Sequence, residues 1–338
     1  MNRRTALKNL SALTLGSLVN AGEVKGSMVS TTEQPVDFEE VKELAPDVFF
    51  SKGKVEYFKS GNYQAVECNN GWIVFEDFVV LIDANFPAKA EILLREIAKT
   101  TSKPVRYVFN THHHSDHIYG NRFWFSQGAT AIAHTGVVAE LRKYETGYYS
   151  NKPGRWENSS SRRTDLMAYS LLPPSMTFEE KLVIEDRHKR LELVHLGAGH
   201  TRGDAVAWLP EHKILFTGDA CLNGPYNLFL DAEPGSWIRT LDKMHALGAE
   251  ILVPGHGELG NHSTVKNQQR YFQVLYEWVT AQKQAGLSYG QLKDKLPELR
   301  TIIRNDEKIK TYLIPEPAVV PSFSLEAQTK KIFEEIIL

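Results

Sequence analysis

The 338-residue sequence contains only two cysteines, Cys68 and Cys221. Two cysteines are too few for the disulfide framework that holds many small secreted domains together, so the fold must depend on a hydrophobic core. Hydrophobic residues make up 42% of the chain, which is ample for one large domain with extensions. We expect Cys221 to be a small buried residue and not a reactive thiol.

The sequence also lacks a large excess of positive or negative charge, and it lacks long apolar runs. The formal net charge is -2, and it is -5 for the part that follows the first 21 residues, which hold Arg3, Arg4 and Lys8 and no acid. Without a basic block, this composition argues against a nucleic-acid partner. No segment has the ~20 consecutive apolar residues that a membrane span needs. We expect a small-molecule substrate as the partner, and the sequence leaves the oligomeric state open.

The first residues have the order of an export signal. Arg3 and Arg4 lie in a pattern close to the twin-arginine motif, an apolar stretch runs from Leu10 to Val19, and Ala21 offers a small residue for cleavage. We predict a signal peptide over residues 1–21, a linker over 22–45 and a periplasmic or exported protein. An ordinary basic N-terminal helix is the alternative.

Four histidines and an aspartate lie within the six residues from His112 to His117. Imidazoles this close repel one another once protonated, whereas neutral imidazole and carboxylate groups are the ligands that zinc and neighbouring metals bind. In an extended loop His112 and His114 point the same way and His113 points away. We therefore assign His112, His114, Asp116 and His117 to metal and expect His113 to face solvent.

Three later stretches each combine an apolar strand, a glycine-containing turn and one ligand-type residue. They are Leu-Gly-Ala-Gly-His200, Leu-Phe-Thr-Gly-Asp219 and Leu-Val-Pro-Gly-His256. Glycine lets the backbone turn sharply and leaves a single side chain projecting from a fixed position. Each stretch alone is typical of an ordinary turn. Together with the histidine loop they supply seven ligands, enough for two adjacent metal sites that share one carboxylate.

Strand and helix patterns alternate along the chain. The first half is predicted to contain short strands from Val48 to Asp83, a helix over 88–100, a strand over 105–109 that leads into the histidine loop, and a helix over 118–126. The second half is again rich in strands and is followed by helices over 234–247 and 263–285. Two runs of strands, each closed by helices, suggest two sheets packed face to face with helices outside. Residues 145–176 are irregular and carry Tyr148, Tyr149 and Trp156, so we expect a flap on the substrate side, with disorder as the alternative.

These motifs, in this order, resemble those of the metallo-β-lactamase superfamily. The resemblance covers Val48 to Gln282. It implies an α+β fold, namely a four-layer αββα sandwich, over residues 46–285. We expect a C-terminal helical extension over residues 286–338 that carries no site chemistry. The resemblance also implies a dinuclear site. By matching motif, the first metal is bound by His112, His114 and His200, the second by Asp116, His117 and His256, and Asp219 bridges them.

The sequence departs from true β-lactamases at Asp219. Lactamases with a metal-binding cysteine carry it at this position, whereas Asp219 is the pattern of the glyoxalase, lactonase and phosphodiesterase-like branches. The resemblance therefore describes the fold better than the substrate, and we do not expect antibiotic hydrolysis to be the main activity. The segment after Asp219 is most similar to the SoxH-like and quinoprotein-relay branch.

The resemblance implies a metal-dependent hydrolase of an ester, lactone, thioester or amide bond, with two divalent ions, zinc by preference, that hold a hydroxide nucleophile between them. Asp116 would orient the nucleophile and pass a proton, and Asn223 or Tyr226 would stabilise the oxyanion. Trp237 is a further candidate beside the substrate, and for all three of these loop residues ordinary packing is the alternative. We interpret Asp83 as structural. A mononuclear iron persulfide dioxygenase is the rival function.

Overall fold

A computed structural model of the chain describes residues 41–56, 66–145, 147–148, 153–316, 318 and 320–337. The predicted signal peptide and the first part of the predicted linker lie outside the described residues. Val41–Ala45, which we expected in the linker, instead forms strand β1 and pairs antiparallel with β2, because Val41 packs against the outer layer and Leu44 and Ala45 pack between the sheets.

Two sheets form the centre of the described chain. The first has the strand order β1-β2-β3-β4-β5-β6-β7, and the second has the order β12-β11-β10-β9-β8. The strands of the first sheet are β1 (Val41–Ala45), β2 (Val48–Ser51), β3 (Asn70–Val74), β4 (Val79–Ile82), β5 (Val105–Asn110), β6 (Thr130–His134) and β7 (Met176–Phe178). Those of the second are β8 (Lys181–Glu185), β9 (Arg190–Val194), β10 (Val206–Leu209), β11 (Ile214–Gly218) and β12 (Ile251–Pro254).

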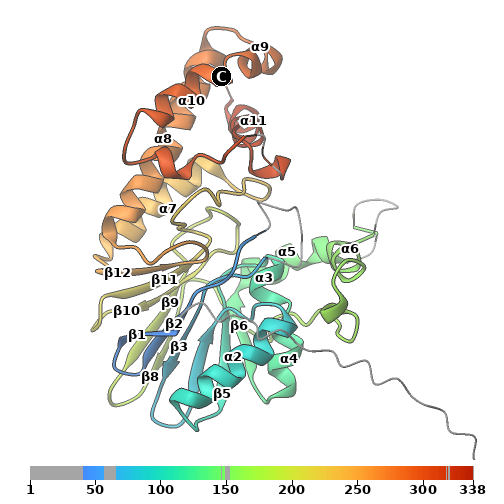
Figure 1. Ribbon diagram of the computed structural model, residues 1–338, viewed down its shortest axis with the longest axis vertical. Coiled ribbons are helices and arrows are strands. Elements are labelled where there is room, and N and C mark those ends of the chain that lie inside the picture. The colour runs from blue at the N-terminus through green and yellow to red at the C-terminus, as the bar shows by residue number, and fades with distance from the viewer. Residues whose placement is uncertain are drawn as a thin grey trace, which may run out of the picture. The chain divides into compact units, whose positions relative to one another are not determined.

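Helices cover the outer faces of both sheets (Figure 1). The helices that follow strands of the first sheet are α2 (Pro87–Thr100), α3 (Ser115–Ile118), α4 (Asn121–Ser126), α5 (Thr135–Leu141), η2 (Arg142–Tyr144), α6 (Arg155–Ser160) and η3 (Thr164–Leu166). Those beyond β11 are α7 (Pro234–Ala246), α8 (His262–Gln284), α9 (Tyr289–Asp294), α10 (Leu296–Arg304), η4 (Lys310–Tyr312), η5 (Pro321–Phe323) and α11 (Leu325–Glu335). None of these described helices is both long and apolar enough to cross a membrane.

The alternation of side chains along the strands builds three apolar layers. In β3, Trp72 and Val74 pack toward α2 and α4, whereas Ile73 packs between the two sheets. On the other side of the second sheet, Leu215 and Leu252 belong to the layer that includes α7, α8 and the C-terminal helices. The predicted αββα sandwich and its C-terminal helices are confirmed.

Strand ends position the site. β4, β5 and β6 run parallel, so their carboxyl ends lie at one edge of the first sheet. In the second sheet, β11 and β12 are also parallel, and the loops that follow them start side by side. Loops at the carboxyl ends of strands are where sheets of this kind carry their functional residues.

Gly71 allows the two sheets to approach each other. A Cβ atom at this position would lie 2.0 Å from Cε1 of Phe216, whose ring is buried in the other sheet. We expect Gly71→Ala to lower the free energy of unfolding by about 2 kcal/mol, because the surrounding core cannot move the ring aside without strain.

Denaturant unfolding tests this expectation. Gly290→Ala in α9 is the matched control, since its Cβ would have only the Ser288 Oγ at 4.0 Å, and we expect it to be neutral or stabilising by up to about 1 kcal/mol. Equal effects of the two substitutions would contradict the packing argument.

Candidate metal centre

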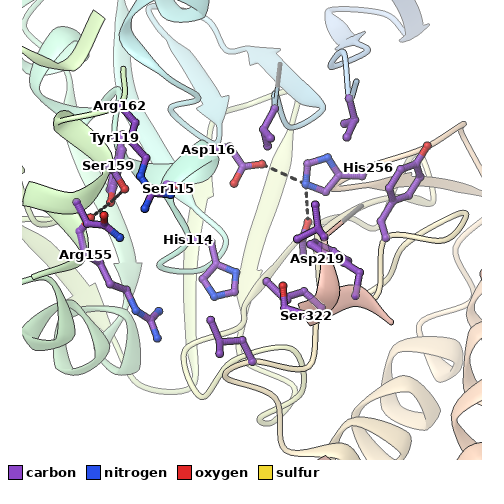
Figure 2. Close-up of a pocket in the computed structure, with 18 of the residues that line it drawn as sticks. His114, Ser115, Asp116, Tyr119, Arg155, Ser159, Arg162, Asp219, His256 and Ser322 are labelled. Carbon is purple, nitrogen blue, oxygen red and sulfur yellow. Dashed lines mark hydrogen bonds and ion pairs between the residues drawn. The ribbon is translucent and has the colours of Figure 1, made fainter. Parts of the chain in front are cut away.

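All seven predicted ligands lie together at one edge of the sandwich. His112 and His114 follow β5, and the short helix α3, which begins directly after His114, carries Asp116 and His117 on its first turn. The other three come from loops of the second sheet and are His200 after β9, Asp219 after β11 and His256 after β12. Figure 2 shows Asp116, Asp219 and His256 facing one another, with His114 beside them.

The first group of ligands consists of three imidazoles and one carboxylate. His114 Nδ1 lies 2.8 Å from His200 Nε2. The Oδ2 atom of Asp219 lies 3.4 Å from His200 Nε2 and 3.9 Å from His112 Nε2. One candidate ligand atom from each of these four residues lies within 4.8 Å of the others, close enough to hold one metal ion.

The second group lies on the other side of Asp219. Asp116 Oδ2 lies 3.1 Å from His256 Nε2 and 3.5 Å from His117 Nε2. The Oδ1 atom of Asp219 lies 3.4 Å from His117 Nε2 and 3.5 Å from His256 Nε2. Asp219 therefore directs one carboxylate oxygen toward each group, which is the geometry of a bridging ligand.

The chemistry of the cluster fits a bound cation. Asp116 and Asp219 are only 6% exposed, and within the described part of the chain no lysine or arginine pairs with either of them. Among the described residues, the buried Nε2 atoms of His112 and His117 also have no hydrogen-bond partner. Without a metal, the positive charge near these carboxylates comes from His117 and His256, whose pKa values are raised, whereas bound metal ions would balance the carboxylates and also satisfy the unpaired ring nitrogens.

Without metal, the protonation that the surroundings favour differs between the two ligand groups. Burial and the neighbouring imidazoles lower the pKa of His112 well below its ordinary value, and burial lowers that of His200 to about 3. Burial acts to raise the pKa of Asp116, but His117 and His256 outweigh it and bring the value to about 2. Burial acts to lower the pKa of His117 and His256, but the neighbouring acidic groups outweigh it and raise both values, so metal binding has to displace these protons. Neutral imidazoles and ionised carboxylates are the forms that ligate metals.

Asp83 orients one of the ligands. It lies just beyond β4 with a φ of 62°, is buried, and accepts a hydrogen bond from His117 Nδ1 through Oδ2 at 2.8 Å. Its Oδ1 accepts from the backbone N–H of Thr111 at 2.8 Å. Because Nδ1 of His117 carries the donated proton, its Nε2 lone pair faces the cluster.

We expect Asp83→Asn to weaken metal binding by about 10- to 100-fold while the fold is kept. Asparagine also tolerates a positive φ, so the backbone need not change. The backbone N–H of Thr111 would keep its hydrogen bond by donating to the amide oxygen of the new side chain, and the amide NH2 would then face His117 Nδ1. His117 would have to accept at Nδ1 and carry its proton on Nε2, where the metal should bind.

Competition with a chromogenic chelator measures this change in affinity. Asp47→Asn is the matched control, because Asp47 has a φ of 65° in an exposed turn away from the cluster. Unchanged affinity in Asp83→Asn would show that Asp83 does not set the tautomer of His117.

His113 does not face solvent, and the expectation that it would is wrong. Its side chain is 0% exposed, and its Nε2 lies 3.4 Å from Oδ2 of Asp231 and 3.4 Å from Arg155. The reason is tertiary: α6 of the 145–176 segment and the loop after Asp219 cover this side of the histidine loop, where Tyr144 also donates a 2.7 Å hydrogen bond to the His113 carbonyl.

Asp231 is a buried residue beside the cluster that the motifs did not reveal. Its Oδ2 lies 2.9 Å from Nε2 of the ligand His114. Arg155 pairs with both of its oxygens, at 2.7 and 2.9 Å, and Lys143 pairs with Oδ1 at 2.9 Å. Burial acts to raise the pKa of Asp231, but hydrogen bonds from His113, His114 and Arg155 hold it far below its usual range. In the sequence, only its position in the loop that follows Asp219 hints at a role.

A pocket of about 400 Å³ opens beside the cluster, and Tyr226 lines it together with Asp116, Asp219 and His256. Asn223 is not among the described lining residues, and its amide donates to the carbonyl of Glu258 at 3.0 Å. Trp237 is fully buried and donates to the carbonyl of Ala220, which is ordinary packing. Cys221 is also fully buried.

Both inserted segments contribute to this pocket. Residues of α6 and the turn after it line one side, in agreement with the expectation of a substrate-side flap over 145–176. The C-terminal extension, which we expected to carry no site chemistry, lines another side through Val320, Ser322 and Phe323. It reaches the pocket because α11 packs on α7 and α8, and η5 packs on α11.

Comparison with known proteins agrees with this geometry. Residues 64–256 match the family described as the metallo-beta-lactamase superfamily. The chain is 30% identical to a metallo-beta-lactamase type 2 of Bacteroides fragilis over 36% of this chain and 51% of that protein. It is 26% identical to a metallo-beta-lactamase type 2 of Bacillus cereus, over 54% of this chain and 64% of that protein. The chain thus spans less than two thirds of either relative.

Further similarities point to the same group of proteins. A hydroxyacylglutathione hydrolase of Synechococcus sp. (strain JA-3-3Ab) is 26% identical over 59% of this chain and 69% of that protein. Among solved structures, a metallo-beta-lactamase from Pontibacter korlensis superposes with a TM-score of 0.56 at 22% identity, over 69% of this chain and 98% of that one, which supports the fold. The placement in the SoxH-like branch stays a prediction.

Proposed function

Since this chain belongs to the metallo-β-lactamase superfamily, we propose that it is a metal-dependent hydrolase that cleaves an ester, lactone, thioester or amide bond of a small molecule. The observation that carries the proposal is the position of the Asp219 carboxylate between the two ligand groups. Its Oδ2 faces the first group and its Oδ1 faces the second. This arrangement favours two metal ions, and the histidine-rich ligand set favours zinc.

The two ligand groups would hold divalent ions, which would supply a water nucleophile at neutral pH and polarise the carbonyl oxygen of the scissile bond. Asp116 lines the pocket as a carboxylate, with its Oδ2 held by His256, so it can orient a water molecule and accept its proton. It can then pass that proton to the leaving group.

Tyr226 is the better placed of the two predicted oxyanion donors. It lines the pocket, and its ring lies 5.9 Å from that of His256. The Asn223 amide already donates to the backbone of the 258–259 segment. We therefore retain Tyr226 as the donor that stabilises developing negative charge on the substrate oxygen, and assign Asn223 to holding the loop that follows His256.

Metal removal and restoration test the proposal. Chelator-treated protein, dialysed and assayed with chromogenic ester, lactone, thioester and β-lactam substrates, should lose its hydrolytic activity by at least about 100-fold and regain it on addition of zinc. We expect the ester, lactone or thioester to be cleaved faster than the β-lactam. Hydrolysis that persists without metal, or the absence of hydrolysis in the zinc-loaded protein, would contradict the proposed function.

A further inference from the structure

The walls of the pocket indicate which small molecules it accepts. The family match ends at His256, whereas Val320, Ser322 and Phe323 of the C-terminal extension lie far beyond it. Figure 2 shows Arg162, Ser159 and Tyr119 to one side of Asp116, and Ser322 in another direction, below Asp219. The pocket therefore extends from the cluster in two directions, toward walls that differ in chemistry.

The wall at α6 is cationic. Among the described lining residues, the only carboxylates are the metal ligands Asp116 and Asp219, and the only lysine or arginine side chains are those of Arg155 and Arg162. Arg155 pairs with Asp231. Arg162 is exposed at the edge of the pocket, where an arginine can exchange a surface partner for a substrate anion at little cost. Its planar guanidinium matches carboxylate, sulfate and phosphate groups.

The wall at the C-terminal extension is apolar. Val320 and Phe323 line it, and Leu228 and Leu230 of the loop after Asp219 add to the apolar lining. Leu230 is 57% exposed. Exposed apolar side chains that gather in a pocket mark a surface for an apolar ligand group.

Hydrogen bonds hold the extension against the site loop. Gln328 of α11 donates to the carbonyl of Asn227 at 3.1 Å and accepts from the hydroxyl of Tyr271 at 2.8 Å, and Gln268 of α8 donates to the Asn227 side chain. All four of these residues are buried. The apolar wall is thus a fixed part of the pocket and not a loosely attached tail.

From these features we propose that the substrate is an anionic amphiphile, whose apolar chain lies against Val320, Phe323 and Leu230 and whose carboxylate, sulfate or phosphate group binds Arg162. The scissile bond would lie at the metal cluster between the two walls. This inference rests on the proposed hydrolase function for the position of the reacting bond, but the anion preference can be measured without any reaction.

Binding of unreactive acids to the zinc-loaded full-length chain tests the cationic wall. Each straight-chain dicarboxylate is compared by calorimetry with the monocarboxylate of the same chain length, for example suberate with octanoate. One carboxylate of either acid can contact the metals, so the second carboxylate reports on Arg162. We expect the best dicarboxylate to bind about tenfold more tightly than its partner, and we expect Arg162→Gln to abolish this preference.

Matched variants show whether the effects belong to Arg162 and Phe323 or follow from the loss of any exposed arginine or apolar side chain. Arg187→Gln, at an exposed arginine paired with Glu76 in another part of the surface, should keep the preference. Phe323→Ala should weaken binding of longer monocarboxylates by about fivefold, whereas Ile302→Ala, at a half-exposed position of α10, should not. Equal binding of mono- and dicarboxylates, or a preference that survives Arg162→Gln, would overturn the proposal.

The two failures can be told apart. A dicarboxylate preference that depends on Arg162, in a zinc-loaded protein that hydrolyses no ester, lactone or thioester, would contradict the proposed function and support the anion-binding wall. Hydrolysis by a protein without this preference would support the function and contradict the substrate class.

Discussion

Replacement of Asp219 by asparagine is expected to lower hydrolysis by roughly three orders of magnitude, since a metal ion contributes several kcal/mol to transition-state stabilisation. Asp219 is the residue that reaches both ligand groups, at 3.4 Å from His200 Nε2 through Oδ2 and at 3.4 Å from His117 Nε2 through Oδ1. An amide has one oxygen and no negative charge, so it can serve one group at most. Bound metal should fall from about two ions per chain to about one or fewer.

Metal analysis and a steady-state assay on the same preparation test this prediction. Asp242→Asn on α7 is the matched control, because Asp242 is an exposed carboxylate that pairs with Lys266 far from the ligands. We expect the control to keep full metal content and activity. If Asp219→Asn retained two ions and normal turnover, Asp219 would not be a bridging ligand.

Replacement of Asp231 by alanine should lower the free energy of unfolding by about 3–5 kcal/mol, the cost of leaving a buried charge without its partner. Asp231 is 5% exposed and faces Arg155 and Lys143, whose side chains are only 22% and 21% exposed. Without Asp231, the positive charges of Arg155 and Lys143 would repel each other, and Glu140 would be the remaining carboxylate that pairs with Lys143. His114 would also lose the hydrogen bond that orients its ring, so metal affinity should fall too.

Chemical denaturation of metal-free and zinc-loaded protein separates these two effects. The destabilisation by Asp231→Ala should already be present without metal and should increase when zinc is bound, because the variant gains less from the ion. Asp231→Asn, which keeps an acceptor for Arg155, should be affected less. A loss below about 1 kcal/mol in the metal-free Asp231→Ala protein would mean that this cluster behaves like an ordinary surface ion pair.

The local sequence was sufficient to predict most of the framework. Helix α2 begins at Pro87, directly after Phe86, and ends before Pro104, as the start and stop signals indicated. The four ligand motifs could be found because each combines an apolar strand with a turn and ligand-type side chains. Their position at a strand end can therefore be predicted from the local sequence, without any tertiary information. The interpretation of Asp83, just beyond β4, as structural did not anticipate its hydrogen bond to His117, because that contact joins two different strand ends.

What the sequence did not reveal depends on contacts between distant segments. His113 is buried because α6 and the loop around Asp231 cover it, and nothing within the histidine loop encodes that cover. Arg155 and Asp231 are separated by 76 residues and meet only in the folded chain. The place of Phe323 in the pocket likewise follows from the return of the C-terminal extension over α8, which has no local signature.

The most direct test of the account is the metal content of the purified protein, measured by elemental analysis together with an absorption spectrum. We predict about two zinc ions per chain and no visible absorption band, as expected for two His- and Asp-liganded zinc sites. About one iron ion per chain would contradict the dinuclear hydrolase and would favour the alternative that the sequence allowed, an iron enzyme of persulfide oxidation.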